Sequence, residues 1–278
     1  MAMPEIQKPC SDDLFQAYRK LYDYDKSELQ AAIESGSDVD SYARLEKVSF
    51  NTAYGSERIM AYLYLPRIGK PPFQTVVHWP GAGAFDNDSI ARYGNPYSRH
   101  NRSGRAWVLP LFQGMFERKT VVEEQHKTAA VEAAIKLVKD FKRTIDYLET
   151  RPPEFDASKL AYEGLSWGAC WGGVLPAIES RVKVAVLRVG GLNLDPACFP
   201  AECSQVNFAP RIKIPILLQN GKRDEFFPIE SKVKPFFALF GTAEKDKQLK
   251  IYDTGHFLKD VANEDELAFL DKYLGPVK

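Results

Sequence analysis

The segment Gly164-Leu165-Ser166-Trp167-Gly168 constrains this chain more than any other feature. An apolar run at 159–162 precedes it, and residues 169–175 follow as a plausible helix start. A serine at the tip of a sharp strand-to-helix turn has an exposed Oγ, and the crowded backbone of that turn requires small residues on both sides. A glycine-bracketed serine also occurs in plain βα turns. The strand before Ser166 and the helix after it therefore favour a nucleophile.

A serine hydroxyl needs a base to take its proton, and the base needs an acid that fixes its tautomer. His256 is the only histidine after Ser166, and it lies in a Gly-His turn behind the β-like run 248–252. Where a serine nucleophile stands at a turn of this kind, the acid and then the histidine follow it along the chain, so His256 is the histidine that fits this order. The alternative interpretation is that His256 is a solvent-exposed loop residue without a catalytic role. The sequence predicts His256 as the base.

The acid is predicted at Asp224, which follows the apolar run 216–218 and would lie at the carboxyl end of a strand. Catalytic groups gather at that edge in open α/β sheets. Alternatives are Glu225, Asp195 and Asp253. Asp224 could also form a surface ion pair with Lys222 or Arg223.

Two backbone amides must converge on the oxyanion that an acyl transfer creates. One is expected from Trp167, at the start of the helix. The other is expected from the glycine-rich loop 78–84, at Ala82, with Gly83 or Gly81 as alternatives. His78 is interpreted as a loop-orienting or core group rather than a second base.

Aromatic residues follow the strand ends or flank the three predicted catalytic residues, and they could line an acyl or aryl pocket or belong to the core. The candidates for the substrate pocket are Phe85, Phe112, Phe226, Phe227 and Phe257.

The remaining pattern predicts an α/β fold. Residues 12–45 are expected to form one or two polar helices, so that residues 1–45 make a helical extension packed on a catalytic domain at 46–278. Runs at 47–54 and 58–65 flank Gly55-Ser56 and indicate an antiparallel hairpin. Short apolar runs at 75–79, 106–109, 159–162, 182–187 and 214–218 are typical of buried parallel strands. Helices with one apolar face are expected at 131–148, which ends before Pro152, and near Leu267–Leu274.

The amino-acid composition argues against binding to nucleic acid or to a membrane. Lys and Arg total 37 and Asp and Glu total 37, so no net field favours nucleic acid or an anionic membrane, and small neutral substrates fit better. The beginning of the chain lacks the pattern of a secretory signal, and no apolar run reaches the length of a membrane span. The four scattered cysteines are expected to be unpaired, Cys198 and Cys203 included. These features favour a cytoplasmic protein.

With Ser166, Asp224 and His256 placed, the chain resembles the α/β-hydrolases of the dienelactone hydrolase and acetyl xylan esterase group. It resembles still more closely the serine hydrolase module found C-terminal to some bacterial Ser/Thr protein kinases, here without a kinase domain. The likeness runs from about residue 12 to the end. It is carried by segments 46–50, 54–55, 62–66, 76–83, 143–148 and 164–168.

The resemblance implies an α/β-hydrolase fold with a mainly parallel sheet and helices on both faces. It also implies hydrolysis of small carboxylic esters, with short acyl or aryl groups, without metal or organic cofactor. Dienelactone hydrolases proper use a cysteine nucleophile, so Ser166 argues against dienelactone as the substrate. A peptidase, amidase or thioesterase using the same triad, and a non-catalytic regulatory module, remain alternatives. Oligomeric state stays open, with a homodimer possible.

Overall fold

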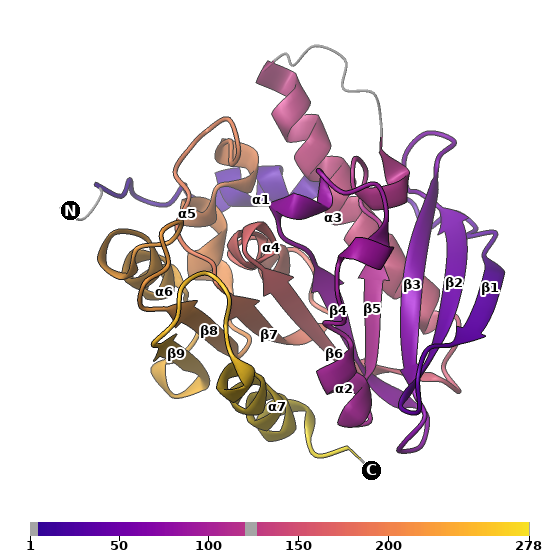
Figure 1. Ribbon diagram of the computed structural model, residues 1–278. Coiled ribbons are helices and arrows are strands. Elements are labelled where there is room, and N and C mark those ends of the chain that lie inside the picture. The colour runs from indigo at the N-terminus through magenta and orange to yellow at the C-terminus, as the bar shows by residue number, and fades with distance from the viewer. Residues whose placement is uncertain (1–4, 120–126, 278) are drawn as a thin grey trace.

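Nine strands form one mixed sheet in the computed structural model, which describes residues 5–119 and 127–277 (Figure 1). Their order across the sheet is β1-β2-β3-β5-β4-β6-β7-β8-β9. The strands are β1 Ala32–Asp38, β2 Ala43–Asn51, β3 Arg58–Pro66, β4 Phe73–Trp79, β5 Ala106–Pro110, β6 Phe155–Leu165, β7 Val182–Arg188, β8 Ile216–Gly221 and β9 Lys247–Tyr252.

The antiparallel part of the sheet is its N-terminal part. β2 and β3 form the expected hairpin, in which Asn51 pairs with Arg58 next to the turn, and Gly55 within the turn has a φ of 55°. A positive φ costs glycine little, because glycine has no Cβ to collide with the backbone. β3 then pairs antiparallel with β5.

The prediction of helices throughout residues 12–45 was wrong for its second half. One helix, α1 Asp12–Lys20, is followed by the edge strand β1, and β2 already begins at Ala43. Every residue of β1 is exposed. A strand with both faces in solvent needs no alternation of apolar and polar residues, so the sequence pattern gave no sign of it. The boundary expected at residue 45 thus falls inside the common sheet.

The parallel part runs from β5 through β4, β6, β7 and β8 to β9. Its central strands have both faces covered, which explains their continuous apolar runs. Helices α2 Ser98–Arg102 and α7 Asp260–Leu274 lie on one face, and the long α3 Lys127–Glu149 passes behind β3 and β5 on the other (Figure 1). The mixed sheet with helices on both faces is the α/β architecture that the sequence predicted.

Three short helices complete the fold: α4 Trp167–Trp171, α5 Gln205–Phe208 and α6 Lys234–Leu239. The predicted apolar stripe of α3 is buried at Ala134, Val138, Phe141, Ile145 and Leu148. The helix ends at Glu149, shortly before Pro152-Pro153, as the proline signal indicated. None of the helices in the described ranges is long and apolar enough to cross a membrane.

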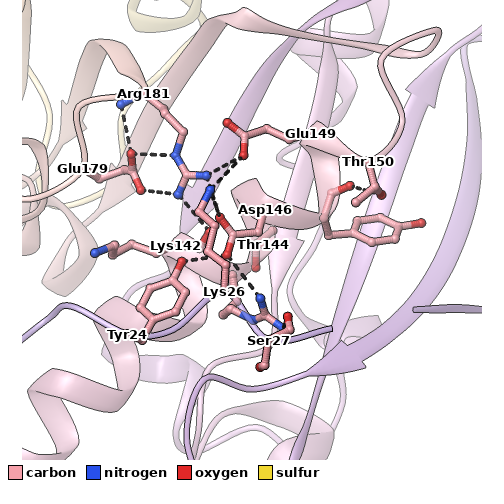
Figure 2. Close-up of polar contacts among 12 residues, drawn as sticks. Tyr24, Lys26, Ser27, Lys142, Thr144, Asp146, Glu149, Thr150, Glu179 and Arg181 are labelled. Atoms are coloured by element: carbon pink, nitrogen blue, oxygen red, sulfur yellow. Dashed lines mark hydrogen bonds and ion pairs between the residues drawn. The ribbon is translucent and has the colours of Figure 1, made fainter. Parts of the chain in front are cut away.

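The N-terminal segment is held to α3 by a polar cluster (Figure 2). The Tyr24 hydroxyl donates to Oδ2 of Asp146 at 2.8 Å, and Arg181 donates to Oδ1 of the same carboxylate at 2.6 Å. Lys26 approaches Asp146 to 3.4 Å from the solvent side. Arg143, almost fully buried, lies 3.3 Å from Asp146 on the interior side. Asp146 is therefore the common acceptor of this cluster.

We expect Asp146→Ala to reduce the free energy of unfolding by about 3–5 kcal/mol, because it leaves a buried guanidinium without its carboxylate. Lys26→Ala is the matched control from the same cluster. Its side chain is 66% exposed, so its loss should cost less than about 1 kcal/mol. Urea unfolding of both variants measures the difference. Equal effects would contradict the central role of Asp146.

Candidate active site

Ser166 stands at the sharp turn between β6 and α4, with φ of 54° and ψ of −111°. Few residues other than glycine adopt a positive φ, so the surroundings must impose it. The Ser166 amide donates to the carbonyl of Arg188 at the end of β7, at 2.8 Å. A Cβ on Gly164 would lie 2.4 Å from the Gly168 carbonyl oxygen, and one on Gly168 would lie 2.1 Å from the Trp79 oxygen. Both flanking glycines are therefore required by contact.

Ser166, His256 and Asp224 form a hydrogen-bonded row. Nε2 of His256 lies 3.0 Å from Oγ of Ser166, and Nδ1 lies 2.8 Å from Oδ2 of Asp224. The Asp224 side chain is fully buried, whereas His256 is 18% exposed and Ser166 is partly accessible. Three segments separated by up to 90 residues along the chain thus meet at the carboxyl edge of the sheet.

The loops that carry Asp224 and His256 are joined by backbone hydrogen bonds. The amide of Lys222 donates to the Tyr252 carbonyl at 2.7 Å, and that of Arg223 donates to Thr254 at 2.9 Å. A Cβ on Gly221 would lie 2.0 Å from the Gly255 carbonyl oxygen, so glycine is needed where the loops cross. This contact fixes the distance between the acid and the base.

Both oxygens of the Asp224 carboxylate have hydrogen-bond partners. Its Oδ1 accepts from the amides of Phe226 at 2.9 Å and Phe227 at 3.1 Å, which leaves Oδ2 for His256. A carboxylate that accepts several backbone bonds is held in one orientation.

The alternative acids lie elsewhere. Glu225 is exposed, Asp253 forms an exposed ion pair with Arg223, and Asp195 accepts from the amide of Ala197. Among the upstream histidines, His126 lies outside the described residues.

The glycine-rich loop lies directly beside the serine. A Cβ on Gly81 would lie 3.3 Å from Cβ of Ser166, and Gly81 precedes the single 3₁₀ turn η1 Ala82–Ala84. The amides of Ala82 and Trp167 stand at the first positions of η1 and α4, where no intrahelical acceptor exists. Both amides therefore remain candidates for the donors to a group bound at Ser166 Oγ.

The aromatic candidates divide into two groups. Phe112 has no exposed surface and stacks on Trp79 with ring centroids 4.3 Å apart, so it belongs to the core and we remove it from the pocket candidates. Phe227 is nearly buried, 5.9 Å from the His256 ring between centroids.

Three further aromatic side chains are exposed around Ser166 and His256. Phe226 and Phe257 pack edge-on to the His256 ring, at 4.9 and 5.9 Å between centroids, and Phe85 packs edge-on to Trp167 at 5.2 Å. Their exposed fractions are 65%, 88% and 37%. Phe85, Phe226 and Phe257 are called the aromatic rim below.

A buried charge cluster beneath the turn was missed by the sequence reasoning. Glu163 of β6 and Glu266 of α7 are almost fully buried, and Arg99 of α2 contacts both carboxylates. Arg188 at the end of β7 also pairs with Glu266. Nε2 of His100 lies 3.3 Å from each carboxylate. The sequence signal that could have predicted this cluster is the presence of charged residues within otherwise apolar strand and helix faces.

The two arginines keep these acids ionised. Burial acts to raise the pKa of Glu163, but the Arg99 charge holds that pKa well below its ordinary value. For Glu266 burial again opposes ionisation, yet Arg99 and Arg188 lower the pKa to about 2. The cluster links β6, β7, α2 and α7 beneath the candidate site.

His100, Glu163 and Glu266 are also the one group in the described ranges whose ligand atoms lie close enough, within 4.8 Å, to hold a metal ion. Two guanidinium groups already contact these carboxylates. A metal cation would be repelled by both, so the donor set fits an ion-pair cluster better than a metal centre.

Comparison with protein families places more than half of the chain in one family. The profile of the dienelactone hydrolase family matches residues 111–271. No curated protein sequence matches the chain.

Solved structures of low sequence identity share the fold. Acetyl xylan esterase 1 from Thermoanaerobacterium sp. JW/SL YS485 has a TM-score of 0.75 at 18% identity, covering 98% of this chain and 99% of its own. The acetyl xylan esterase from Paenibacillus sp. R4 has a TM-score of 0.74 at 17% identity, covering 98% and 97%. A putative dienelactone hydrolase from Klebsiella pneumoniae subsp. pneumoniae MGH 78578 has a TM-score of 0.60 at 18% identity, covering 81% and 98%.

The charge cluster generates a prediction about acid stability. Because the pKa of Glu266 is about 2 in the folded chain against 4.5 as its ordinary value, its ionised form stabilises the fold above about pH 4.5. That contribution should be lost as the pH falls toward 2. Glu266→Gln should be less stable at pH 7 and lose less stability than the wild type over this interval. Denaturant unfolding at several pH values measures it.

Glu230→Gln is the matched control, since this glutamate is exposed and, among residues 5–119 and 127–277, pairs only with Lys234 four residues on. Its stability curve should follow the wild type. Parallel curves for Glu266→Gln and the wild type would contradict the assigned role of Glu266.

Proposed function

Because the chain belongs to the dienelactone hydrolase family of hydrolases, we propose that Ser166, His256 and Asp224 are a catalytic triad that cleaves small carboxylic esters. The observation that carries the proposal is the continuous row from Ser166 Oγ through both ring nitrogens of His256 to Oδ2 of Asp224. A hydroxyl, an imidazole and a buried carboxylate in this order are the parts that acyl transfer needs.

The first half of the reaction is acylation. Nε2 of His256 takes the proton from Oγ of Ser166, and Oγ attacks the ester carbonyl carbon. The Asp224 carboxylate keeps the His256 proton on Nδ1 and stabilises the imidazolium that forms. His256 then gives the proton to the leaving alcohol, and the acyl group stays on Ser166.

Deacylation repeats these steps with water. His256 accepts a proton from water, whose oxygen attacks the acyl carbon, and the carboxylic acid leaves as Ser166 regains its proton. In both tetrahedral intermediates the amides of Trp167 and Ala82 donate to the oxyanion. Both lie at helix N-termini, where the backbone carries a partial positive charge.

The aromatic rim indicates the kind of ester. Phe226 and Phe257 pack against His256, and Phe85 packs against Trp167, the residue after Ser166. All three rings are exposed next to the residues that would hold the reacting carbonyl. Exposed aromatic rings bind planar apolar groups by stacking and burial. We therefore propose esters with an aryl or short apolar group as substrates.

Ser166→Ala should lower kcat for p-nitrophenyl acetate by about 10⁴-fold or more and abolish labelling by a fluorophosphonate, because no nucleophile remains. Ser158→Ala is the control: this exposed serine lies at the opposite end of the same strand. Its kcat should match the wild type. A Ser166→Ala variant with wild-type turnover would refute the triad.

Ala82→Pro tests the second oxyanion donor. Proline lacks the amide proton but is compatible with the first position of a helical turn, and Gly81 already has the extended conformation that proline requires before it. We expect kcat to fall about 10²- to 10³-fold with little change in KM. Ala82→Gly keeps the amide and should stay near wild type. Unchanged kcat in Ala82→Pro would move the donor to Gly81 or Gly83.

Phe226→Ala should lower kcat/KM for phenyl acetate about fivefold and leave ethyl acetate unchanged, because only the aryl ester can stack on the ring. Steady-state rates with both esters measure the ratio. Equal losses for the two esters would show that Phe226 supports His256 rather than the substrate.

A further inference from the structure

The loop that carries His256 runs from the end of β9 to the start of α7, over residues 253–259 (Figure 1). Its first half is held to the neighbouring loop, because the carbonyl of Thr254 accepts from the amide of Arg223 at 2.9 Å. Its second half extends into solvent, since Phe257, directly after the histidine, is 88% exposed. The position of His256 therefore depends on how the two ends of the loop are fixed.

One buried side chain bonds to the segments at both ends of this loop. Gln219 of β8 has no exposed surface. Its Nε2 donates to the hydroxyl of Tyr252, the last residue of β9, at 2.9 Å, and to the carbonyl of Ala262, in the first turn of α7, at 2.7 Å. The Tyr252 hydroxyl in turn donates to Oδ2 of Asp265 at 2.6 Å. A single amide group thus links the strand before the loop to the helix after it.

The orientation of this amide follows from its neighbours. The Ala262 carbonyl can only accept a hydrogen bond, so the nitrogen of the Gln219 amide, and not its oxygen, must face it. A hydrogen bond in the buried interior is electrostatically stronger than one in water. A side chain of similar size without the NH₂ group would keep the packing and lose both links.

The backbone of Gln219 also adjoins the turn that carries the nucleophile. Its carbonyl accepts from the amide of Val189 at 2.7 Å. The carbonyl of Arg188, one residue earlier, accepts from the Ser166 amide at 2.8 Å. Val189 has a φ of 49°, which is unusual for a β-branched residue, so the contacts around it must hold this conformation. Gln219 therefore lies where the segments of the nucleophile and the base are joined.

We propose that Gln219 is a positioning residue whose amide fixes both ends of the His256 loop and so keeps Nε2 of His256 within reach of Oγ of Ser166. The inference rests on the proposed function and assigns a task to a residue outside the triad. Proton transfer needs the 3.0 Å separation of these two atoms, and a small displacement of the base lowers the rate steeply. Gln219 acts on the reaction only through the loop.

One substitution removes the two links, and a matched one serves as its control. Gln219→Met deletes both donated hydrogen bonds and keeps an unbranched side chain of similar length. Gln248→Met makes the same change in the neighbouring strand β9. The Gln248 side chain is half-buried and makes no hydrogen bond within residues 5–119 and 127–277.

The first measurement compares turnover of p-nitrophenyl acetate with the rate and the extent of labelling by a fluorophosphonate. In Gln219→Met, kcat should fall about 10-fold and KM should change less than about 2-fold, because the base is displaced and the substrate site is retained. The second-order rate constant of labelling should fall by a similar factor, since labelling needs the same proton transfer. The final extent of labelling should equal that of the wild type. Gln248→Met should match the wild type in all four values.

A purely structural role for Gln219 gives a different result. Loss of folded molecules would lower the extent of labelling and leave kcat per labelled site unchanged, and that result would overturn the inference. A Gln219→Met variant with wild-type kcat would overturn it too, as would an equal loss of kcat in Gln248→Met.

Tyr252→Phe tests the same inference if Gln219→Met does not fold. It removes the hydroxyl at one end of the loop and leaves the bond from Gln219 to Ala262, so kcat should fall by a smaller factor, about 3-fold. Tyr273→Phe is its control, because that hydroxyl lies at the other end of α7 and donates to Oδ1 of Asp246 at 3.2 Å. Equal kcat in the two tyrosine variants would overturn the inference.

Ser166→Ala separates this inference from the proposed function. Turnover that survives in Ser166→Ala refutes the triad. An inactive Ser166→Ala beside Gln219→Met and Tyr252→Phe variants of wild-type kcat refutes only the positioning role.

Discussion

The close approach of two backbones, at the end of β4 and at the turn after β6, is the constraint on which the candidate site depends. A Cβ on Gly168 would collide with the carbonyl of Trp79, and a Cβ on Gly81 would lie 3.3 Å from that of Ser166, so the two segments are closely packed. β4 and β6 are adjacent parallel strands, and their carboxyl ends therefore meet at one edge. The serine and the loop amides come together because of this pairing. The unusual φ of Ser166 persists because the surrounding contacts hold it there.

A buried cluster of ion pairs lies beneath the turn. Two buried carboxylates, Glu163 and Glu266, are balanced by Arg99 and Arg188. Removing one partner from such a cluster leaves an uncompensated buried charge, which is far more costly than losing a surface pair. The same Glu163 contacts His78. The charge cluster in the core thereby adjoins β4, the strand that leads into the loop beside Ser166.

The order of the strands in the sheet explains how Ser166, Asp224 and His256 come to lie next to one another. β6 leads to Ser166, β8 leads to Asp224 and β9 leads to His256, while β7 between β6 and β8 supplies the carbonyl that accepts from the Ser166 amide. Crossed loops after β8 and β9 set the separation of acid and base, and Gly221 permits their contact. The shared fold with acetyl xylan esterases of 17% and 18% identity indicates that this backbone layout tolerates extensive sequence change. The exposed aromatic rim lies on loops, where such change is least constrained.

The sequence by itself determined the class of fold, the parallel strands, the end of α3 near Pro152 and the residues Ser166, Asp224 and His256 that the structure brings together. These features have local causes: apolar runs, a proline that cannot continue a helix, and glycines required by a sharp turn. Only the tertiary structure decided that residues 32–38 form an edge strand, that Phe112 belongs to the core, and that Glu163 and Glu266 share Arg99. Exposed edge strands carry no periodic pattern, and burial and charge pairing depend on neighbours distant in the chain, which no local pattern contains.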